Sequence, residues 1–407
     1  MTGISLLDNP VQEYAWGSRT FIPRLLGKPS PSRAPQAELW MGAHPNGTSK
    51  VFWENRWTLL SDLIEKDPPG MLGKDTAARF CNRLPFLFKI IATSKPLSIQ
   101  AHPNQEQALE GFKKEINQAI PLSAPNRNYR DPFHKPEILC ALTPFWALKG
   151  FRTVNEIRSM LDRIGFPAAE VPYLQEEGKN ALKKLFTSLF TMPGKKQRRL
   201  VSEMVSAAEA HASSNPAFAW MIGLHREFPY DVGVLGPLLL NLIHLKPCEA
   251  LSIAAGELHC YLDGAGIEVM VNSDNVLRGG LTEKHIDIPE LLEILNFSPG
   301  KKNVLHPEAR RSGEWFYVEG SEEFILSRIS LDHDRFYESP LNRSVEIIIC
   351  VQGESEVSDI GTGDELRLSC GSSIIVPAQV RGYRIRGDGT LYKATVPLDE
   401  SKGSHGS

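Results

Sequence analysis

The spacing of hydrophobic residues changes along the chain. From Leu84 to Ala147, short apolar or alternating runs such as PFLFKIIAT and PLSIQAH are bounded by Pro, Asn, Asp and Ser. Short runs with turn residues at their ends are typical of antiparallel strands. Between Thr153 and Pro229, apolar residues instead recur every three to four positions, as they do on one face of a helix. The pattern therefore predicts a helical segment inserted into a β-rich chain.

The inserted segment is expected to contain four helices. The first pattern, TVNEIRSMLDRI, places Thr153 three residues before Glu156, which is the spacing of a capping box. The next three patterns are NALKKLFTSLF, QRRLVSEMVSAAEAHA and AFAWMIGLHREF. Strand-like runs return after residue 229, interrupted by a short helix pattern at DIPELLEIL. We therefore expect a mainly β protein with one α-helical domain inserted into it.

Two segments far apart in the chain resemble each other. Leu245 to His259 reads LKPCEALSIAAGELH and Leu368 to Gly382 reads LSCGSSIIVPAQVRG, so that ALSI aligns with SIIV without a gap. A repeated unit of this kind predicts two similar β domains. Only the first copy ends in a histidine, where the second has a glycine. We expect one domain to carry the chemistry and the other to be structural.

These patterns divide the chain into four parts. Residues 1–152 together with 230–300 are expected to form the β domain that carries the chemistry, with 153–229 as the inserted helical domain. Residues 301–398 are expected to form the second β domain. The tail 399–407 is polar and rich in Gly and Ser, which predicts disorder.

Composition and charge narrow the classes of protein that the chain can be. It has 407 residues, of which 42% are hydrophobic and 23% charged, and a formal net charge of -3. No basic surface argues for nucleic-acid or membrane binding, no apolar run is long enough to cross a membrane, and the N-terminus lacks signal-peptide features. Six scattered cysteines without a Cys-x-x-Cys pair are typical of reduced thiols. We expect a cytoplasmic monomer that binds a small molecule.

Four side chains could bind a metal ion. In PLSIQAHPN, Gln100 and His102 are two residues apart and so point to one face of a strand. HKPE contributes Glu137, and GELHCY contributes His259. Imidazole, carboxylate and amide ligands suit a divalent first-row metal, with zinc as the default, and are typical of a catalytic site. Spacing alone leaves open a plain turn with an ion-paired glutamate, and the other histidines, His44 included, are interpreted as ordinary surface or core residues.

A second polar cluster, EVMVNSDNVLRGGLT, contains Glu268, Asp274 and Arg278. The Arg278 guanidinium could bind an anionic group or stabilise an oxyanion, although a solvated arginine in a hairpin turn is the alternative. Lys89, within the apolar run PFLFKI, either snorkels or reaches into a pocket, and Lys135 belongs to HKPE. The chain has no P-loop, nucleophile elbow or convincing dinucleotide fingerprint, which argues against nucleotide-dependent transfer, serine hydrolysis and NAD chemistry.

Taken together, seven segments resemble the type I mannose-6-phosphate isomerase family, also called phosphomannose isomerases. In chain order they are YAWGS, AELWMGAHP, PFLFK, PLSIQAHPN, HKPE, AGELHCYLDG and MVNSDNVLRGGLT. The resemblance runs from residue 14 to about residue 290, and the C-terminal β-rich region is compatible with it. The sequence departs from the family at Phe133, where asparagine is frequent, and at Ala255, where cupin turns often have proline. Neither departure removes a candidate ligand.

The resemblance implies a cupin architecture, with two cupin-like β-barrel (jelly-roll) domains and the helical domain inserted into the first. It implies one Zn²⁺ ion per chain, or another divalent first-row metal, bound by four side chains: Gln100, His102, Glu137 and His259. Arg278 is implied to be the catalytic arginine. The residues expected to line the substrate pocket are Lys89, Lys135, Asp274, Trp16 of YAWGS and Ser98 of PLSIQAHPN.

The activity implied by the resemblance is the interconversion of mannose 6-phosphate and fructose 6-phosphate, in mannose metabolism and the supply of mannose 6-phosphate for GDP-mannose. The hypothesis is a metal-assisted proton transfer through a cis-enediol, with Arg278 stabilising the developing charge. Four residues qualify by type as the base, and the sequence does not choose among them: Lys135, His134, Glu268 and Asp274. Two alternatives stay open, namely another metal-dependent cupin enzyme such as a dioxygenase, and a non-catalytic cupin that binds a sugar phosphate.

Overall fold

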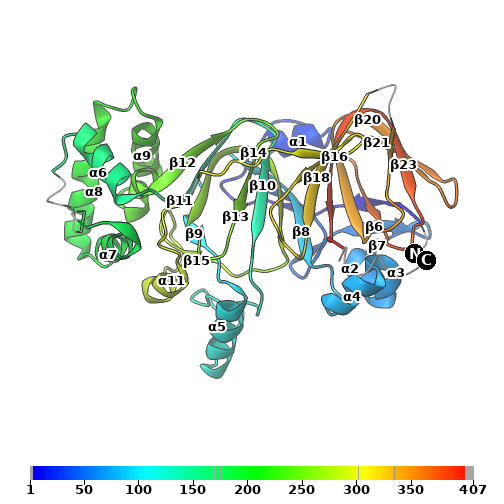
Figure 1. Cartoon of the computed structure of the whole chain (residues 1–407), viewed down its shortest axis with the longest axis horizontal. Helices are drawn as coiled ribbons and strands as arrows, with labels where there is room; N and C mark the ends of the chain where they lie inside the picture. The colour runs from blue at the N-terminus through cyan, green and yellow to red at the C-terminus, as the bar shows by residue number, and fades with distance from the viewer. Residues whose placement is uncertain are drawn as a thin grey trace.

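The computed structural model describes residues 3–167, 171, 173–174, 176–300, 302–332 and 336–398. The tail 399–407, for which the sequence predicts disorder, lies outside these residues. The described chain is mostly β, and the helices of residues 154–227 gather at one end of the molecule, while other helices lie elsewhere (Figure 1). None of its helices is both long and apolar enough to cross a membrane. The expectation of a mainly β protein with a helical insertion is therefore confirmed.

Among the described residues, ten antiparallel strands form the sheet that holds the candidate metal ligands. The main path follows this order: β12 (Leu240–Leu245), β11 (Phe145–Phe151), β14 (His259–Val271), β8 (Phe86–Thr93), β3 (Glu38–Met41) and β2 (Val11–Gln12). Four further strands attach to it: β10 (Glu137–Ala141), β13 (Ala250–Ile253), β9 (Gln100–Ala101) and β15 (Leu277–Arg278). Every residue of β8 is buried, which explains why its sequence reads as a continuous apolar run around one lysine.

The second large sheet has eleven strands within the described chain. Its path follows this order: β16 (Glu308–Arg311), β17 (Glu314–Tyr317), β18 (Ile325–Leu331), β23 (Tyr383–Thr395), β20 (Glu346–Asp359), β22 (Ser373–Val376), β1 (Ser5–Asp8), β6 (Lys50–Trp53) and β7 (Arg56–Leu59). Strand β19 (Phe336–Glu338) pairs with β23, and β21 (Glu365–Ser369) pairs with β20. The first strand of the chain thus lies in the sheet built from its last hundred residues, because Ser5 pairs with Ile375. The division into domains drawn from the sequence stays a prediction.

The inserted helices connect two neighbouring strands, β11 and β12, which pair with each other. In chain order they are α6 (Val154–Arg163), α7 (Gly178–Phe190), α8 (Gly194–Glu209), α9 (Pro216–Glu227), a 3₁₀ turn η2 (Val232–Leu235) and α10 (Gly236–Leu239). The capping box predicted for the first helix is present, since Thr153 accepts a hydrogen bond from the Glu156 N–H and Glu156 accepts one from the Thr153 N–H. The apolar faces of these helices share one buried core.

The remaining helices lie outside the insertion. They are α1 (Phe21–Leu25), α2 (Leu60–Lys66), α3 (Pro68–Leu72), α4 (Lys74–Arg79), α5 (Gln105–Asn117) and α11 (Ile288–Ile294). A two-stranded ribbon joins β4 (Ala43–His44) to β5 (Gly47–Thr48). Helix α5 begins at Asn104, which forms a capping box with Gln107. This cap lies two residues after His102, so the helix starts shortly after strand β9 ends at Ala101.

Candidate metal centre and active site

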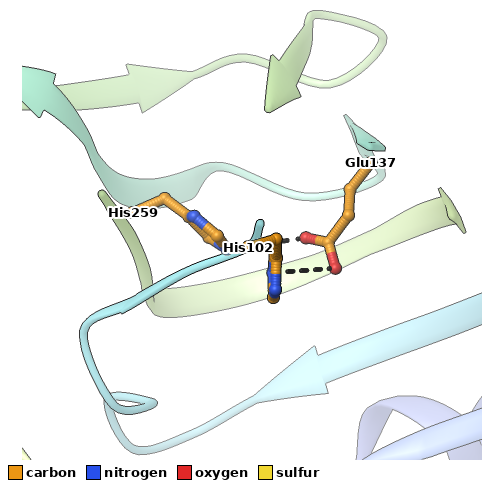
Figure 2. A group of neighbouring side chains, drawn as sticks. All are labelled: His102, Glu137 and His259. Atoms are coloured by element: carbon orange, nitrogen blue, oxygen red, sulfur yellow. Dashed lines mark ion pairs between the residues drawn. The ribbon is translucent and has the colours of Figure 1, made fainter. Parts of the chain in front are cut away.

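Three candidate ligands meet inside the first sheet. His102 follows β9, Glu137 begins β10 and His259 begins β14. Their side chains are at most 2% exposed, and one ligand atom from each lies within 4.8 Å of the others. Figure 2 shows the two imidazole rings and the carboxylate turned toward one another. The structure thus joins residues from three segments that the sequence could only nominate one at a time.

The hydrogen bonds of the two histidines determine which nitrogen faces the centre. His102 Nδ1 lies 2.7 Å from the carbonyl of Asn275, and His259 Nδ1 lies 3.0 Å from the carbonyl of Glu257. A carbonyl only accepts, so each Nδ1 carries the proton and each Nε2 presents a lone pair. Within the described chain, both Nε2 atoms and Glu137 Oε2 are buried without a hydrogen-bond partner. This donor set fits a divalent metal ion.

Charge around the centre favours the protonation states that a metal requires. Burial, followed by the nearby Lys135 ammonium, lowers the pKa of His102 to about 4, so this imidazole is neutral at neutral pH. Burial alone would raise the pKa of Glu137, but Lys135 and His102 outweigh it and the pKa is lowered. Lys135 Nζ lies 3.0 Å from Glu137 Oε1. The centre therefore offers the neutral imidazole of His102 and an ionised carboxylate, as metal binding requires.

Asn275, which the sequence left without a role of its own, holds the ligand His102 in place. It is fully buried, and its side-chain oxygen accepts a hydrogen bond from the Arg130 N–H at 2.7 Å. Its amide nitrogen donates to the Asp131 carbonyl at 2.7 Å. The residue thus ties the loop before HKPE to the ring of His102, as partners of ligating histidines commonly do.

Gln100 lies beside the three ligands. On β9 it is directly opposite His259 on β14 and Arg278 on β15. Opposite residues of antiparallel strands have their side chains on the same face. Gln100, His259 and Arg278 therefore form a row across three strands. Metal ligation by Gln100 stays a prediction, supported by this placement.

Lys89 is buried and forms ion pairs with two glutamates. On β8 it is opposite Glu268 on β14, and its Nζ contacts the Glu268 carboxylate and lies 3.9 Å from Glu38 Oε1. Burial would lower the pKa of Lys89, but Glu268 and Glu38 raise it above its usual range. Burial raises the pKa of Glu268 against the opposing charge of Lys89. Lys89 is thus engaged with carboxylates rather than reaching the surface.

A cavity of about 890 Å³ has Asp274, Arg130, His134 and Phe133 among its lining residues, but none of the three candidate ligands. Asp274 is held by His44, whose Nε2 lies 3.4 Å from Oδ1, and by Asn46, whose Nδ2 donates to Oδ2 at 2.8 Å. Burial opposes ionisation, but the His44 hydrogen bond and charge lower the pKa of Asp274. His44 was interpreted from the sequence as ordinary; only its place in AELWMGAHP distinguished it.

Three cations are coupled by electrostatic repulsion, one of them, Arg130, lines this cavity, and the sequence identified only Arg278. Burial and the charge of Arg130 lower the pKa of Arg278. Burial, Arg278 and Arg130 in turn lower the pKa of Lys284. Arg130 lies in a loop and Lys284 in an exposed turn. Apart from their charge, no motif or spacing in the sequence marks either residue as part of the site. Together the three form a site suited to an anionic group.

The other residues proposed from the sequence take separate positions. The Nε2 atom of His134 lies 2.7 Å from Oε1 of Glu323, which is in the connection between β17 and β18. Trp16 packs against the hydrophobic cluster that contains Tyr261. Ser98 is half-buried two residues before Gln100. Substrate binding by Trp16 and Ser98, and proton transfer by His134, stay predictions.

Comparison with known proteins agrees with this geometry. The model of the type I phosphomannose isomerase catalytic domain matches residues 4–154, and that of the family's helical insertion domain matches residues 156–240. The mannose-6-phosphate isomerase of Escherichia coli (strain K12) is 40% identical over 392 residues, covering 95% of this chain and 97% of that protein. The chain belongs to the type I phosphomannose isomerase family. The resemblance found in the sequence is thereby confirmed.

More distant relatives and a solved structure extend the agreement. The mannose-6-phosphate isomerase of Bos taurus is 32% identical over 421 residues, covering 96% of this chain and 95% of that protein. A crystal structure of mannose 6-phosphate isomerase in a zinc-bound holo form superposes with a TM-score of 0.89 at 37% identity, covering 97% of this chain and all of that one. The family assignment therefore rests on nearly the whole length of the chain.

Proposed function

We propose that the protein interconverts mannose 6-phosphate and fructose 6-phosphate with the help of one zinc ion. The observation that carries the proposal is the convergence of two imidazoles and a carboxylate, each with a buried ligand atom lacking a hydrogen-bond partner in the described chain. The names of the relatives agree with this activity, as does the zinc in the holo structure.

The metal would be held by His102, Glu137 and His259, with Gln100 as the fourth ligand. When bound, it supplies a Lewis acid next to the C1 and C2 oxygens of the opened sugar, and another divalent first-row metal could serve in its place. Arg278 lies in the same row as Gln100, where its guanidinium would stabilise the negative charge of the enediolate. Arg130 and Lys284 would hold the phosphate group.

Glu268 is the group we propose to move the proton. It projects from β14 to the same face as Glu137, because it is opposite Leu139, which lies two residues beyond Glu137 on β10. Its raised pKa suits a group that takes a proton from C2 and returns it to C1. Asp274 has a lowered pKa, so we assign its carboxylate to accepting hydrogen bonds from the sugar hydroxyls. Lys135 would keep Glu137 ionised.

A coupled isomerase assay on mannose 6-phosphate, with and without a chelator, tests the activity and its metal. Turnover that survives complete metal removal would contradict the metal-assisted mechanism. Glu268→Gln should retain the metal and lose ~10²-fold or more in kcat. Asp263→Asn is the matched control, since Asp263 is an exposed carboxylate on the same strand. Unchanged turnover in Glu268→Gln would remove Glu268 from the proton transfer.

The remaining parts of the proposal concern the assembly. We propose that the two sheets form cupin-like domains, and that the protein acts as a cytoplasmic monomer on a small sugar phosphate, without nucleic-acid or membrane partners. Strands at matched positions in the two sheets support the assignment of two cupin-like domains. Size-exclusion chromatography with light scattering tests the monomer.

A further inference from the structure

The two sheets place a glutamate at the same position. Glu137 begins β10, opposite Ile253 of β13 and Met270 of β14. Glu346 begins β20, opposite Val376 of β22 and Thr395 of β23. Ile253 and Val376 are also the matched final residues of the repeated segments ALSI and SIIV. By sheet pairing, Glu346 is the counterpart of the metal-site carboxylate Glu137.

A second glutamate is matched in the same way. In the first sheet, Lys89 of β8 is opposite both Glu268 of β14 and Trp40 of β3, and Glu38 lies two residues before Trp40. In the second sheet, Ser327 of β18 is opposite both Lys393 of β23 and Phe316 of β17. Glu314 lies two residues before Phe316 and is therefore the counterpart of Glu38.

The two sheets differ in where their positive charge lies. Lys393 is opposite Ile348, two residues beyond Glu346, so it occupies the position that Glu268 has in the first sheet. The position of Lys89 is taken by Ser327. In the repeated segment, Gly382 stands where His259 stands. The second sheet thus keeps two carboxylates, lacks the histidine and carries its lysine where the first sheet has Glu268.

Lys393 is surrounded by oxygen atoms. Its Nζ lies 2.6 Å from Glu314 Oε1, 3.3 Å from Glu346 Oε1 and 2.8 Å from the Tyr337 hydroxyl. Lys393, Glu314, Glu346 and Tyr337 are each at most 2% exposed. Burial would lower the pKa of Lys393, but Glu346, Tyr337 and Glu314 raise it above its usual range. The ammonium is therefore charged and desolvated between two carboxylates.

Part of this cluster has unused hydrogen-bonding capacity. Glu346 Oε2 is buried and, within the described chain, has no hydrogen-bond partner at ordinary distance, and the buried Tyr383 hydroxyl also has none. Arg343 Nη1 lies 3.7 Å from this oxygen. Ser327 donates to Glu314 Oε1 at 2.7 Å. A buried carboxylate with a free oxygen is costly without a compensating cation.

We propose that Lys393 is the resident cation of a second, metal-free copy of the metal centre, and that removing its ammonium leaves a site for a divalent cation. Glu314, Glu346 and the Tyr337 hydroxyl would then be the donors. A set made only of oxygen atoms suits a hard cation such as Mn²⁺ better than the histidine-containing first centre does. The inference does not depend on the isomerase activity, because it concerns a cluster on the other sheet.

The test uses the zinc-loaded full chain and Mn²⁺ alone, with binding followed by electron paramagnetic resonance. Lys393→Ala should bind one additional Mn²⁺ per chain relative to the wild type, and Lys393→Ala with Glu346→Gln should lose that ion. The matched control is Arg127→Ala, which removes a buried cation that faces one carboxylate, that of Glu115, at 3.4 Å. No added Mn²⁺ is expected there.

Two results would overturn the proposal. One is a folded Lys393→Ala variant that binds no more Mn²⁺ than the wild type. The other concerns a Lys393→Ala variant that does not fold. In that case the triple variant Lys393→Ala, Glu314→Gln, Glu346→Gln, in which both carboxylates are neutralised as well, is expected to fold. Failure of the triple variant to fold would show that Lys393 fills space rather than balancing charge, whereas its recovery would support the proposal.

Discussion

Acidification of the metal-free protein should reveal the buried state of His102. The pKa of this imidazole drops from 6.5 to about 4 on folding, chiefly because of burial and then because of Lys135. A lowered pKa means that the unfolded chain takes up the proton first as pH falls. The free energy of unfolding contributed by the neutral imidazole is therefore complete above about pH 6.5 and is lost progressively down to about pH 4.

The size of the loss follows from the same two pKa values. Each pH unit of difference corresponds to about 1.4 kcal/mol, so the full loss from His102 is about 3 kcal/mol. That is a large part of the stability of an ordinary domain, which is typically about 5–15 kcal/mol. The zinc-free state is required, because a bound metal ion competes with the proton for Nε2.

Urea unfolding of chelator-treated protein, followed by circular dichroism between about pH 7 and pH 4.5, measures the effect. His102→Gln removes the titrating ring, so the stability difference between wild type and variant should shrink by most of the predicted ~3 kcal/mol over this range. His285→Gln, at an exposed histidine outside the ligand set, is the control. Parallel losses in wild type and His102→Gln would refute the assignment of a buried neutral imidazole.

Four further outcomes are expected. Arg278→Ala should lower kcat by ~10²-fold or more if the guanidinium stabilises the enediolate, and an effect confined to KM in steady-state kinetics would reassign it to binding. Gln100→His should bind the metal as tightly as the wild type or more tightly in chelator competition, while turnover falls. Unchanged turnover would show that the glutamine does not adjust the reactivity of the metal. His44→Leu should lower kcat/KM more than His44→Gln does, because glutamine can still donate to Asp274, and equal losses would rule out a role for that hydrogen bond. Thr153→Ala should cost about 1 kcal/mol in urea unfolding with isomerase activity retained, since only the helix cap is lost.

Local patterns predicted the parts of this fold that depend on near neighbours in the chain. The capping box at Thr153 and Glu156 and the spacing of apolar residues after it are set within one helix, so the inserted helices could be located. His102, Glu137 and His259 were found because each sits in a short segment that the family shares. Their convergence within 4.8 Å required the pairing of strands distant in the sequence.

Other contacts of the site could not be predicted from the sequence. His44 reaches Asp274 across a separation of about 230 residues, and His134 meets Glu323 from the connection between β17 and β18. Arg130 and Lys284 are ordinary charged loop residues until the fold brings them to Arg278. Such contacts depend on tertiary structure, which neither periodicity nor motif spacing encodes.

The pairing of β1 with β22 sets an order of events during synthesis. Ser5 leaves the ribosome about 370 residues before its partner Ile375. Until then β1 has an unpaired edge, which is a template for aggregation. The second sheet therefore closes only when nearly all of the chain has been made. A fragment that begins at residue 301 would lack three of its strands, β1, β6 and β7, so this region should not fold as an excised piece.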